Sequence, residues 1–168
     1  MNEDLKVDKN LPDEEIYKLL IPQIESLITA DDTILSNLCN ITAALKDSFE
    51  KISWVGFYIL KEKKLHLGPF QGKIACTQIN LGSGVCGTSA SKRETIIVEN
   101  VHEFPGHIAC DSGSNSEIVL PIIYKQNLFG VLDLDSYRYS AFDTTDKNYL
   151  EQILKIVTSK LDLQNSLF

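Results

Sequence analysis

Long apolar runs are missing from this 168-residue sequence. No stretch approaches the roughly 20 apolar residues that a helix needs to cross a bilayer, so we expect no association with a membrane. Basic clusters are missing too: 23 acidic residues outnumber 16 lysines and arginines, and the net charge is −7. The longest basic feature, residues 61–64, is typical of a hairpin turn. We therefore expect no nucleic-acid partner.

Targeting signals and linkers are also missing. Residues 1–10 are acidic and polar, unlike a signal or transit peptide, which predicts a cytoplasmic protein. No internal repeat, low-complexity segment or long linker divides the chain. We expect a flexible N-terminal tail over residues 1–11 and a single domain over residues 12–168.

Cysteine is scarce but present, at Cys39, Cys76, Cys86 and Cys110. In the reducing cytosol these four residues are not expected to form structural disulfides. Metal binding and redox catalysis are the better interpretations. Cys39 falls within a helical pattern, where a cysteine is most often a small core side chain, and it needs no redox role.

Hydrophobic periodicity predicts helices at both ends of the chain and strands between them. We expect Pro22 to kink or divide the first helix, because its ring removes a hydrogen bond and clashes with the preceding turn. The order indicates an α+β fold, with helices packed against an antiparallel sheet. The expected helices cover residues 12–28, 31–49, a short stretch ending near 92, and a segment starting near 143; the strands cover 54–60, 65–67, 74–79, 95–98, 118–124 and 128–134; residues 100–116 form a long loop.

Several short motifs are shared with a known family. They are WVGFY at 54–58, GPFQG at 68–72, AC at 75–76, GVCGT at 84–88, VH at 101–102, FPGHIACD at 104–111, SEIVLP at 116–121 and GVLDLDS at 130–136. With these motifs the sequence resembles the free methionine-(R)-sulfoxide reductases, a branch of the GAF domains, over most of residues 12–160. The resemblance implies a GAF-type domain that reduces free methionine (R)-sulfoxide without a bound cofactor.

Thiol chemistry explains why such an enzyme needs more than one cysteine. A thiolate attacks the sulfoxide sulfur, and a thioether and a cysteine sulfenic acid are formed. A second thiol condenses with the sulfenic acid to give a disulfide, which an external dithiol such as thioredoxin reopens by exchange. Cys76, Cys86 and Cys110 meet this requirement if they lie around one pocket.

The residues alone leave open which cysteine attacks. Cys86 begins a short helix, where unpaired backbone N–H groups favour a thiolate. Cys110 lies in the long loop, in a setting that we expect to be mobile and exposed. The resemblance implies that Cys110 attacks and Cys76 resolves, and that Cys86 lies in the pocket and also pairs with Cys110. A zinc site built from these three cysteines with His102 or His107 is the main alternative.

Three acids are candidates for holding the ammonium group of a free amino acid, because carboxylates form the strongest hydrogen bonds to such a cation. Asp133 and Asp135 are two apart on an expected strand, so their side chains share a face. Their mutual repulsion raises at least one pKa, and a carboxyl that stays protonated can donate to the sulfoxide oxygen. Glu117 completes the set, and the resemblance implies roles at all three positions.

Trp54 and Tyr58 are four apart on an expected strand and also share a face. They are candidates for enclosing the S-methyl group, because contact between sulfur and an aromatic ring is favourable. Core packing is the alternative for both. His102 and His107 flank residues 104–106 and either brace this loop or assist proton transfer.

Other classes of function remain in competition with the enzyme. A non-catalytic GAF module that binds a small ligand does not need three pocket thiols, and a zinc-dependent structural domain needs its ligands in close pairs. We expect free methionine-R-sulfoxide as the substrate and thioredoxin as the reductant. A homodimer formed through the helical face is a further expectation.

Overall fold

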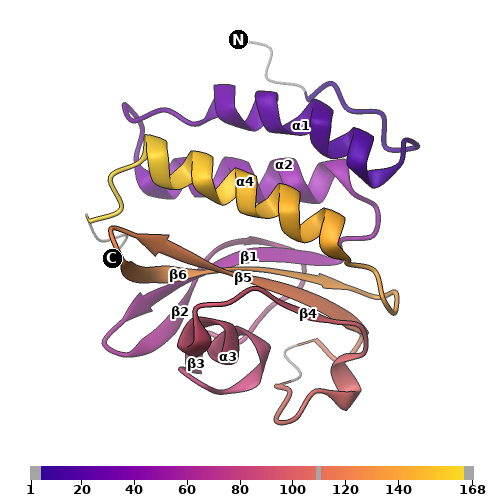
Figure 1. Ribbon diagram of the computed structural model, residues 1–168, viewed down its shortest axis with the longest axis vertical. Coiled ribbons are helices and arrows are strands. Elements are labelled where there is room, and N and C mark those ends of the chain that lie inside the picture. The colour runs from indigo at the N-terminus through magenta and orange to yellow at the C-terminus, as the bar shows by residue number, and fades with distance from the viewer. Residues whose placement is uncertain (1–4, 109–110, 165–168) are drawn as a thin grey trace.

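The computed structural model describes residues 5–108 and 111–164. Figure 1 shows two layers, with three long helices stacked on one face of a curled sheet and a short helix on the other. The chain order confirms the expected α+β architecture. The helices are α1 (Asp13–Leu27), α2 (Ile34–Ser48), α3 (Gly84–Lys92) and α4 (Thr144–Lys160); the strands are β1 (Trp54–Lys61), β2 (Lys64–Gln71), β3 (Gln78–Asn80), β4 (Ile96–Val98), β5 (Ser116–Tyr124) and β6 (Asn127–Ser136).

The six strands form one antiparallel sheet in the order β3-β2-β1-β6-β5-β4. Strands β1 and β6 lie at the centre, although 65 residues separate their nearest ends in the sequence. Because side chains alternate along a strand, each central strand contributes to two different layers. In β1, Val55 and Phe57 face the helices, whereas Trp54 and Tyr58 belong to the cluster on the opposite face.

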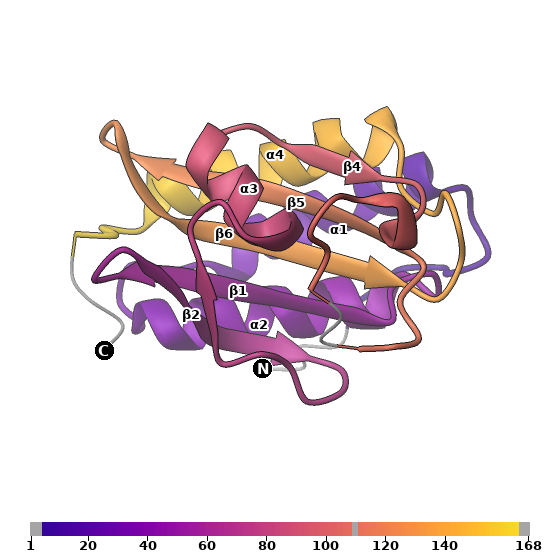
Figure 2. The ribbon, with the colours of Figure 1, turned by 90° about the horizontal axis from the view of Figure 1, so that it is seen from below.

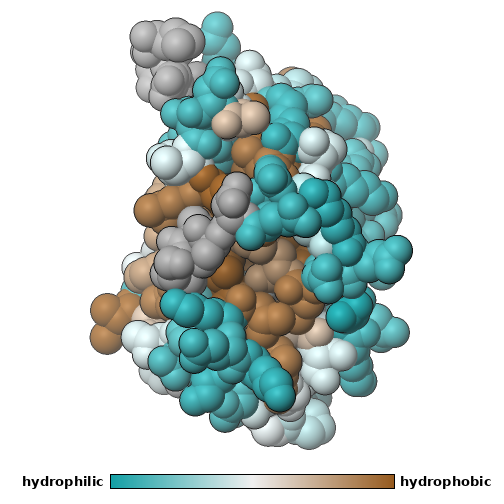
Figure 3. Space-filling model, turned by 90° about the vertical axis from the view of Figure 1, so that its left-hand side faces the viewer, coloured by the Kyte–Doolittle hydropathy of each residue, from teal (hydrophilic) through white to brown (hydrophobic). Residues whose placement is uncertain are grey.

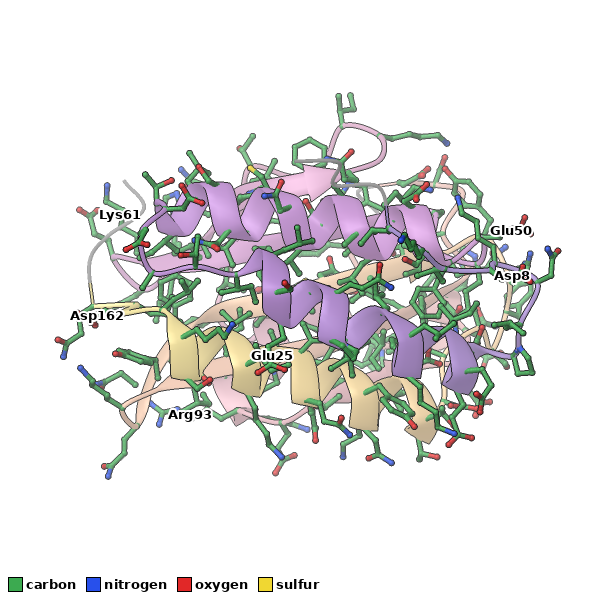
Figure 4. All side chains as sticks on the ribbon, turned by 90° about the horizontal axis from the view of Figure 1, so that it is seen from above. Asp8, Glu25, Glu50, Lys61, Arg93 and Asp162 are labelled. Carbon is green, nitrogen blue, oxygen red and sulfur yellow. The ribbon has the colours of Figure 1, made fainter. Side chains whose placement is uncertain are left out.

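Helices α2 and α4 lie on one face of the sheet, and α1 packs on top of both, as Figure 4 shows from above. Helix α1 begins after Pro12 with three acids in its first turn, and it continues through Pro22 without a break. The expected division at this proline was therefore wrong. Helix α4 begins with a capping box between Asp143 and Asp146, which satisfies backbone N–H groups at its start.

Other elements differ from the sequence-based expectation in detail. The strand expected at 74–79 is a loop followed by the three-residue strand β3. The loop at 100–116 contains a 3₁₀ turn at Val101–Glu103, and β5 begins at Ser116. Cys39 is exposed on α2 and is not the core residue that we expected. In the N-terminal segment, Leu5 and Val7 pack against the core.

The opposite face of the sheet carries α3 and the connection that leads to β5, as Figure 2 shows from below. Helix α3 approaches β3 so closely that a Cβ atom at Gly87 would lie 2.2 Å from the carbonyl oxygen of Asn80. The lack of a side chain at Gly87 therefore allows α3 to pack close to β3. No helix in the described part of the chain is long and apolar enough to span a membrane.

Candidate active site

A cavity opens between α3, the sheet and the loops around it, and the space inside it, counted out to its open mouth, is about 520 Å³. The described residues that line it are Trp54, Tyr58, Ile74, Ala75, Ile79, Ser83, Gly84, Val85, Cys86, His107, Ile108, Asp111, Ser114, Glu117, Asp133 and Asp135. The cavity therefore brings together all the predicted site residues that the structure describes, apart from Cys76.

The register of the sheet explains how the acids meet. Asp135 on β6 pairs with Trp54 on β1 at one side and with Glu117 on β5 at the other. Asp133 lies two residues earlier on β6 and shares their face, as the alternation predicts. Glu117 reaches the group because β5 and β6 form an antiparallel pair.

Burial controls the ionisation of these acids. It raises the pKa of Asp133 to about 7, and it raises the pKa of Glu117 and of Asp135 well above the ordinary values. The charge of Asp133 adds to the shift at the other two acids. The predicted direction is therefore confirmed, but desolvation and not repulsion is its main cause.

The acids have no matching cation. None of the described residues that line the cavity is a lysine or an arginine. His107 Nε2 lies 4.0 Å from Glu117 Oε2, but burial lowers the pKa of this histidine. Oδ1 of Asp133 is buried and has no hydrogen-bond partner among the described residues. A ligand with a positive group would satisfy this cluster.

Cys86 lies on the buried side of α3, and its Sγ atom donates a weak hydrogen bond to Glu117 Oε1 over 3.9 Å. Burial raises the pKa of this thiol far above its usual range, and the charges of Asp133 and Glu117 act in the same direction. The expectation of a thiolate stabilised by the helix N-terminus was therefore wrong for Cys86. Desolvation and two acids outweigh the N–H groups of a nine-residue helix.

The two aromatic residues form one wall of the cavity. Their rings stack 6.0 Å apart, and Trp54 also stacks on Phe70 at 5.5 Å. A Cβ atom at Gly56 would lie 2.4 Å from the Trp54 ring, so the glycine between the aromatics gives this ring its place. Core packing and a place in the cavity were treated as alternatives. Trp54 and Tyr58 do both: each belongs to a buried cluster and also lines the cavity.

The same aromatic side chains also hold the loop that carries Cys76. Trp54 Nε1 donates to the carbonyl of Lys73 over 3.0 Å, and the hydroxyl of Tyr58 donates to the carbonyl of Cys76 over 3.0 Å. Cys76 is partly buried against the cluster beneath the cavity and is disulfide-bonded, whereas Cys86 is free. Cys110 lies outside the described residues.

Polar contacts of Asp111 hold a second loop at the mouth of the cavity. Asp111 accepts hydrogen bonds from the N–H of Gly113 and the hydroxyl of Tyr137, and its carboxylate lies 3.4 Å from Lys73 Nζ. Sequence reasoning did not select Lys73 or Tyr137. No local signal identifies them, because they are far apart in the sequence and act only through this contact.

The two histidines have different positions. His107 lines the cavity, whereas His102 forms a hydrogen bond with Asn115 over 3.1 Å and an edge contact with Tyr139. His102 therefore braces the loop, and His107 is available to the site. The zinc alternative also required Cys110, which lies outside the described residues.

Another hollow lies at the far end of the sheet, beside the turn between β5 and β6. Its described lining is mostly apolar and contains no cysteine, histidine or carboxylate: Ile59, Leu60, Lys61, Tyr124, Lys125, Asn127, Leu128, Phe129, Leu163 and Gln164. Figure 3 shows apolar surface on this side of the molecule. With no ionisable acid or thiol, this hollow offers no counterpart to the chemistry of the first cavity.

Comparison with known proteins identifies close relatives. The GAF domain family matches residues 30–162. The chain is 51% identical over 158 residues to GAF domain-containing protein A of Dictyostelium discoideum, covering 94% of this chain and 99% of that protein. It is 44% identical over 140 residues to the free methionine-R-sulfoxide reductase of Escherichia coli, covering 83% and 85%. The free methionine-R-sulfoxide reductase of Neisseria meningitidis, solved in complex with its substrate, superposes with a TM-score of 0.89 at 40% identity, covering 94% and 95%.

Proposed function

Because this chain belongs to the GAF domain family and, within it, to the free methionine-R-sulfoxide reductases, we propose that it reduces free L-methionine (R)-S-oxide to methionine. The observation that carries the substrate assignment is the buried group of Glu117, Asp133 and Asp135, which has no lysine or arginine in its described surroundings. A free amino acid brings an ammonium group to such a cluster, whereas a methionine within a peptide does not.

The proposed reaction begins at the sulfoxide sulfur. The Cys110 thiolate attacks this atom, a protonated carboxyl of the acidic cluster gives its proton to the oxygen, and methionine leaves as Cys110 becomes a sulfenic acid. Burial supports the proton donor, because it raises the pKa of Asp133 to about 7. Trp54 and Tyr58 are proposed to enclose the methylthio group.

Recycling requires a second thiol. We assign this step to Cys76, whose thiol condenses with the Cys110 sulfenic acid and releases water as the disulfide forms. The disulfide-bonded state of Cys76, beside the free thiol of Cys86, supports this assignment. A cytoplasmic dithiol protein of the thioredoxin type then restores both thiols by exchange.

Single-turnover kinetics test the cysteine roles. Cys110→Ser abolishes methionine release, since no other residue supplies the attacking sulfur. Cys76→Ser releases about one methionine per chain in a burst and then turns over slowly. Rapid methionine release by the Cys110→Ser protein would overturn the attack. Full steady-state activity of the Cys76→Ser protein with thioredoxin would assign the resolving step to Cys86.

The acetylated substrate tests the acidic cluster. N-acetylation of methionine (R)-sulfoxide removes the positive charge and leaves buried carboxylates without a partner. We expect kcat/KM to fall by about a hundredfold or more, because charged hydrogen bonds are worth a few kcal/mol and about 1.4 kcal/mol corresponds to tenfold. Equal values for the free and acetylated compounds would show that the cluster does not recognise the amine.

A further inference from the structure

Three ligand atoms of different chemistry meet at the base of the cavity. Cys86, Glu117 and Asp133 each offer one atom, and these atoms all lie within 4.8 Å of one another. All three side chains are buried, at 4%, 6% and 6% exposure. Asp133 Oδ1 has no partner among the described residues. We propose that this cluster is also a binding site for a thiophilic divalent cation, with Zn²⁺ as the type case, and that the cation competes with the substrate.

The ligand set suits zinc in kind and in spacing. Zinc binds thiolate sulfur at about 2.3 Å and carboxylate oxygen at about 2.0–2.2 Å, so tetrahedral ligand atoms lie roughly 3.3–3.8 Å apart. The Cys86 Sγ to Glu117 Oε1 distance of 3.9 Å is already close to this range. All three ligand atoms lie within 4.8 Å of one another. His107 Nε2, 4.0 Å from Glu117 Oε2, is a candidate for the fourth ligand.

The charges of the three proposed ligands favour binding of a divalent cation. The positive charge of a dication favours the deprotonated forms of two buried carboxyls and a buried thiol, which then act as anionic ligands. Binding forms the Zn–S and Zn–O bonds and releases the Cys86 proton, with any carboxyl protons, to solvent. Affinity therefore rises with pH. Mg²⁺ is not expected to bind, because it prefers six oxygen ligands and keeps several of its waters.

This site differs from the three-cysteine zinc site considered from the sequence. It does not use Cys76 or Cys110, and Cys86 is free while Cys76 is disulfide-bonded. The cation can therefore bind in either redox state of the other two cysteines. Competition with the substrate rests on the proposed function, because it assumes that the ammonium group takes the same carboxylates. Metal binding itself does not rest on that function.

Cobalt spectroscopy tests the site without any need for activity. Protein with Cys76→Ser and Cys110→Ser keeps only Cys39 and Cys86, and Co²⁺ bound to a thiolate gives a charge-transfer band and tetrahedral visible bands. We expect one Co²⁺ per chain, displaced by Zn²⁺ and not by Mg²⁺. Adding Cys86→Ser removes the charge-transfer band, and Asp133→Asn weakens Co²⁺ binding at least tenfold. Cys39 is exposed on α2, so adding Cys39→Ser is the matched control and leaves the spectrum unchanged.

Two results would overturn the proposed metal site. A charge-transfer band that survives Cys86→Ser, or no band in the protein that keeps Cys86, excludes this cluster as the ligand set. Far-ultraviolet circular dichroism of each variant separates loss of binding from loss of folding, and the Asp133→Asn protein provides an independent arm because it retains the thiol.

Single-turnover kinetics of the reduced wild-type protein test the competition. Zn²⁺ is expected to raise the apparent KM for free methionine-R-sulfoxide without changing the maximal rate, and a chelator reverses the effect. Zn²⁺ that lowers the maximal rate at saturating substrate would exclude competition at the acids. A protein that binds Co²⁺ as expected but reduces no sulfoxide would refute the proposed function and leave the metal site standing.

Discussion

The two faces of the sheet both bury charged side chains, but they compensate them differently. On the helical face, Lys51 is 8% exposed, and its Nζ atom lies 2.6 Å from Asp13 and 2.7 Å from Asp146. The carbonyl of Ala141 accepts a third hydrogen bond from Lys51, and the Tyr17 hydroxyl donates to Asp146. All the charged groups of this network therefore have partners among the described residues, and the network joins α1, the connection between α2 and β1, and the start of α4.

On the cavity face, Glu117 and Asp133 are buried and Asp135 is half-buried, without a lysine or arginine among the described lining residues. Burying charge without a partner costs several kcal/mol unless the group takes up a proton or a ligand. The comparison teaches that a compensated buried charge serves the fold, whereas an uncompensated group marks the place of a ligand.

Removing the cation on the helical face should destabilise the fold. Lys51→Met leaves Asp146 buried without its cation, and breaking a buried pair costs about 3–5 kcal/mol in the free energy of unfolding. Urea denaturation measures this loss, and kcat/KM of the folded fraction should not change. Lys9→Met is the control, because the Lys9–Asp47 pair is exposed and such pairs contribute about 0–1 kcal/mol. Similar losses in both variants would remove the distinction between the networks.

Removing an acid on the cavity face should have the opposite pattern. Asp133→Asn is expected to lower kcat/KM for free methionine-R-sulfoxide about a hundredfold, which corresponds to about 2.7 kcal/mol. Its free energy of unfolding should stay the same or rise, because an uncompensated buried carboxyl is lost. Asp32→Asn, in the exposed connection between α1 and α2, controls for the substitution itself. A large loss of stability in Asp133→Asn would mean that this acid supports the fold.

The dependence of stability on pH should distinguish the two faces further. Acids whose pKa is raised by folding stabilise the protein below the unfolded value, near 4, and this contribution is lost as pH rises through the folded value. For Asp133 the folded pKa is about 7. Between pH 5 and 7 we expect each such group to lower the free energy of unfolding by up to about 1.4 kcal/mol per pH unit. Denaturation of wild type and Asp133→Asn across this range should show a flatter profile in the variant.

The exposed contact at the cavity mouth should have the smallest effect on stability. Lys73 is 63% exposed where it meets Asp111, so Lys73→Ala should leave the free energy of unfolding almost unchanged. If the contact holds the loops of Cys76 and Cys110 together, disulfide formation should slow a few-fold while methionine release is unchanged. Quenched-flow trapping of thiols measures this, with Lys73→Arg as the rescue and Lys64→Ala as the control. Equal rates in Lys73→Ala and wild type would assign the contact no part in recycling.

Much of the architecture follows from local sequence patterns. Helical spacing predicts α1, α2 and α4, and the glycine-rich segment predicts α3 within a few residues. Alternation along the strands places Trp54 with Tyr58 and Asp133 with Asp135 on one face, and the structure confirms both pairs. The prediction of a strand over 74–79 was wrong, because only Gln78–Asn80 form a strand. Side chains that favour strands do not determine whether a neighbouring strand is available for pairing.

The sequence by itself therefore determined the α+β fold, the alternation that presents the acids and aromatics, and the motif spacing that relates the chain to its family. The tertiary structure decided which of these groups are neighbours and which of them keep their protons. Trp54 meets Asp135 only through the pairing of β1 with β6, and Lys51 meets Asp146 across 95 residues. Desolvation, which depends on every neighbour in space, keeps the Cys86 thiol protonated against the local preference of its helix.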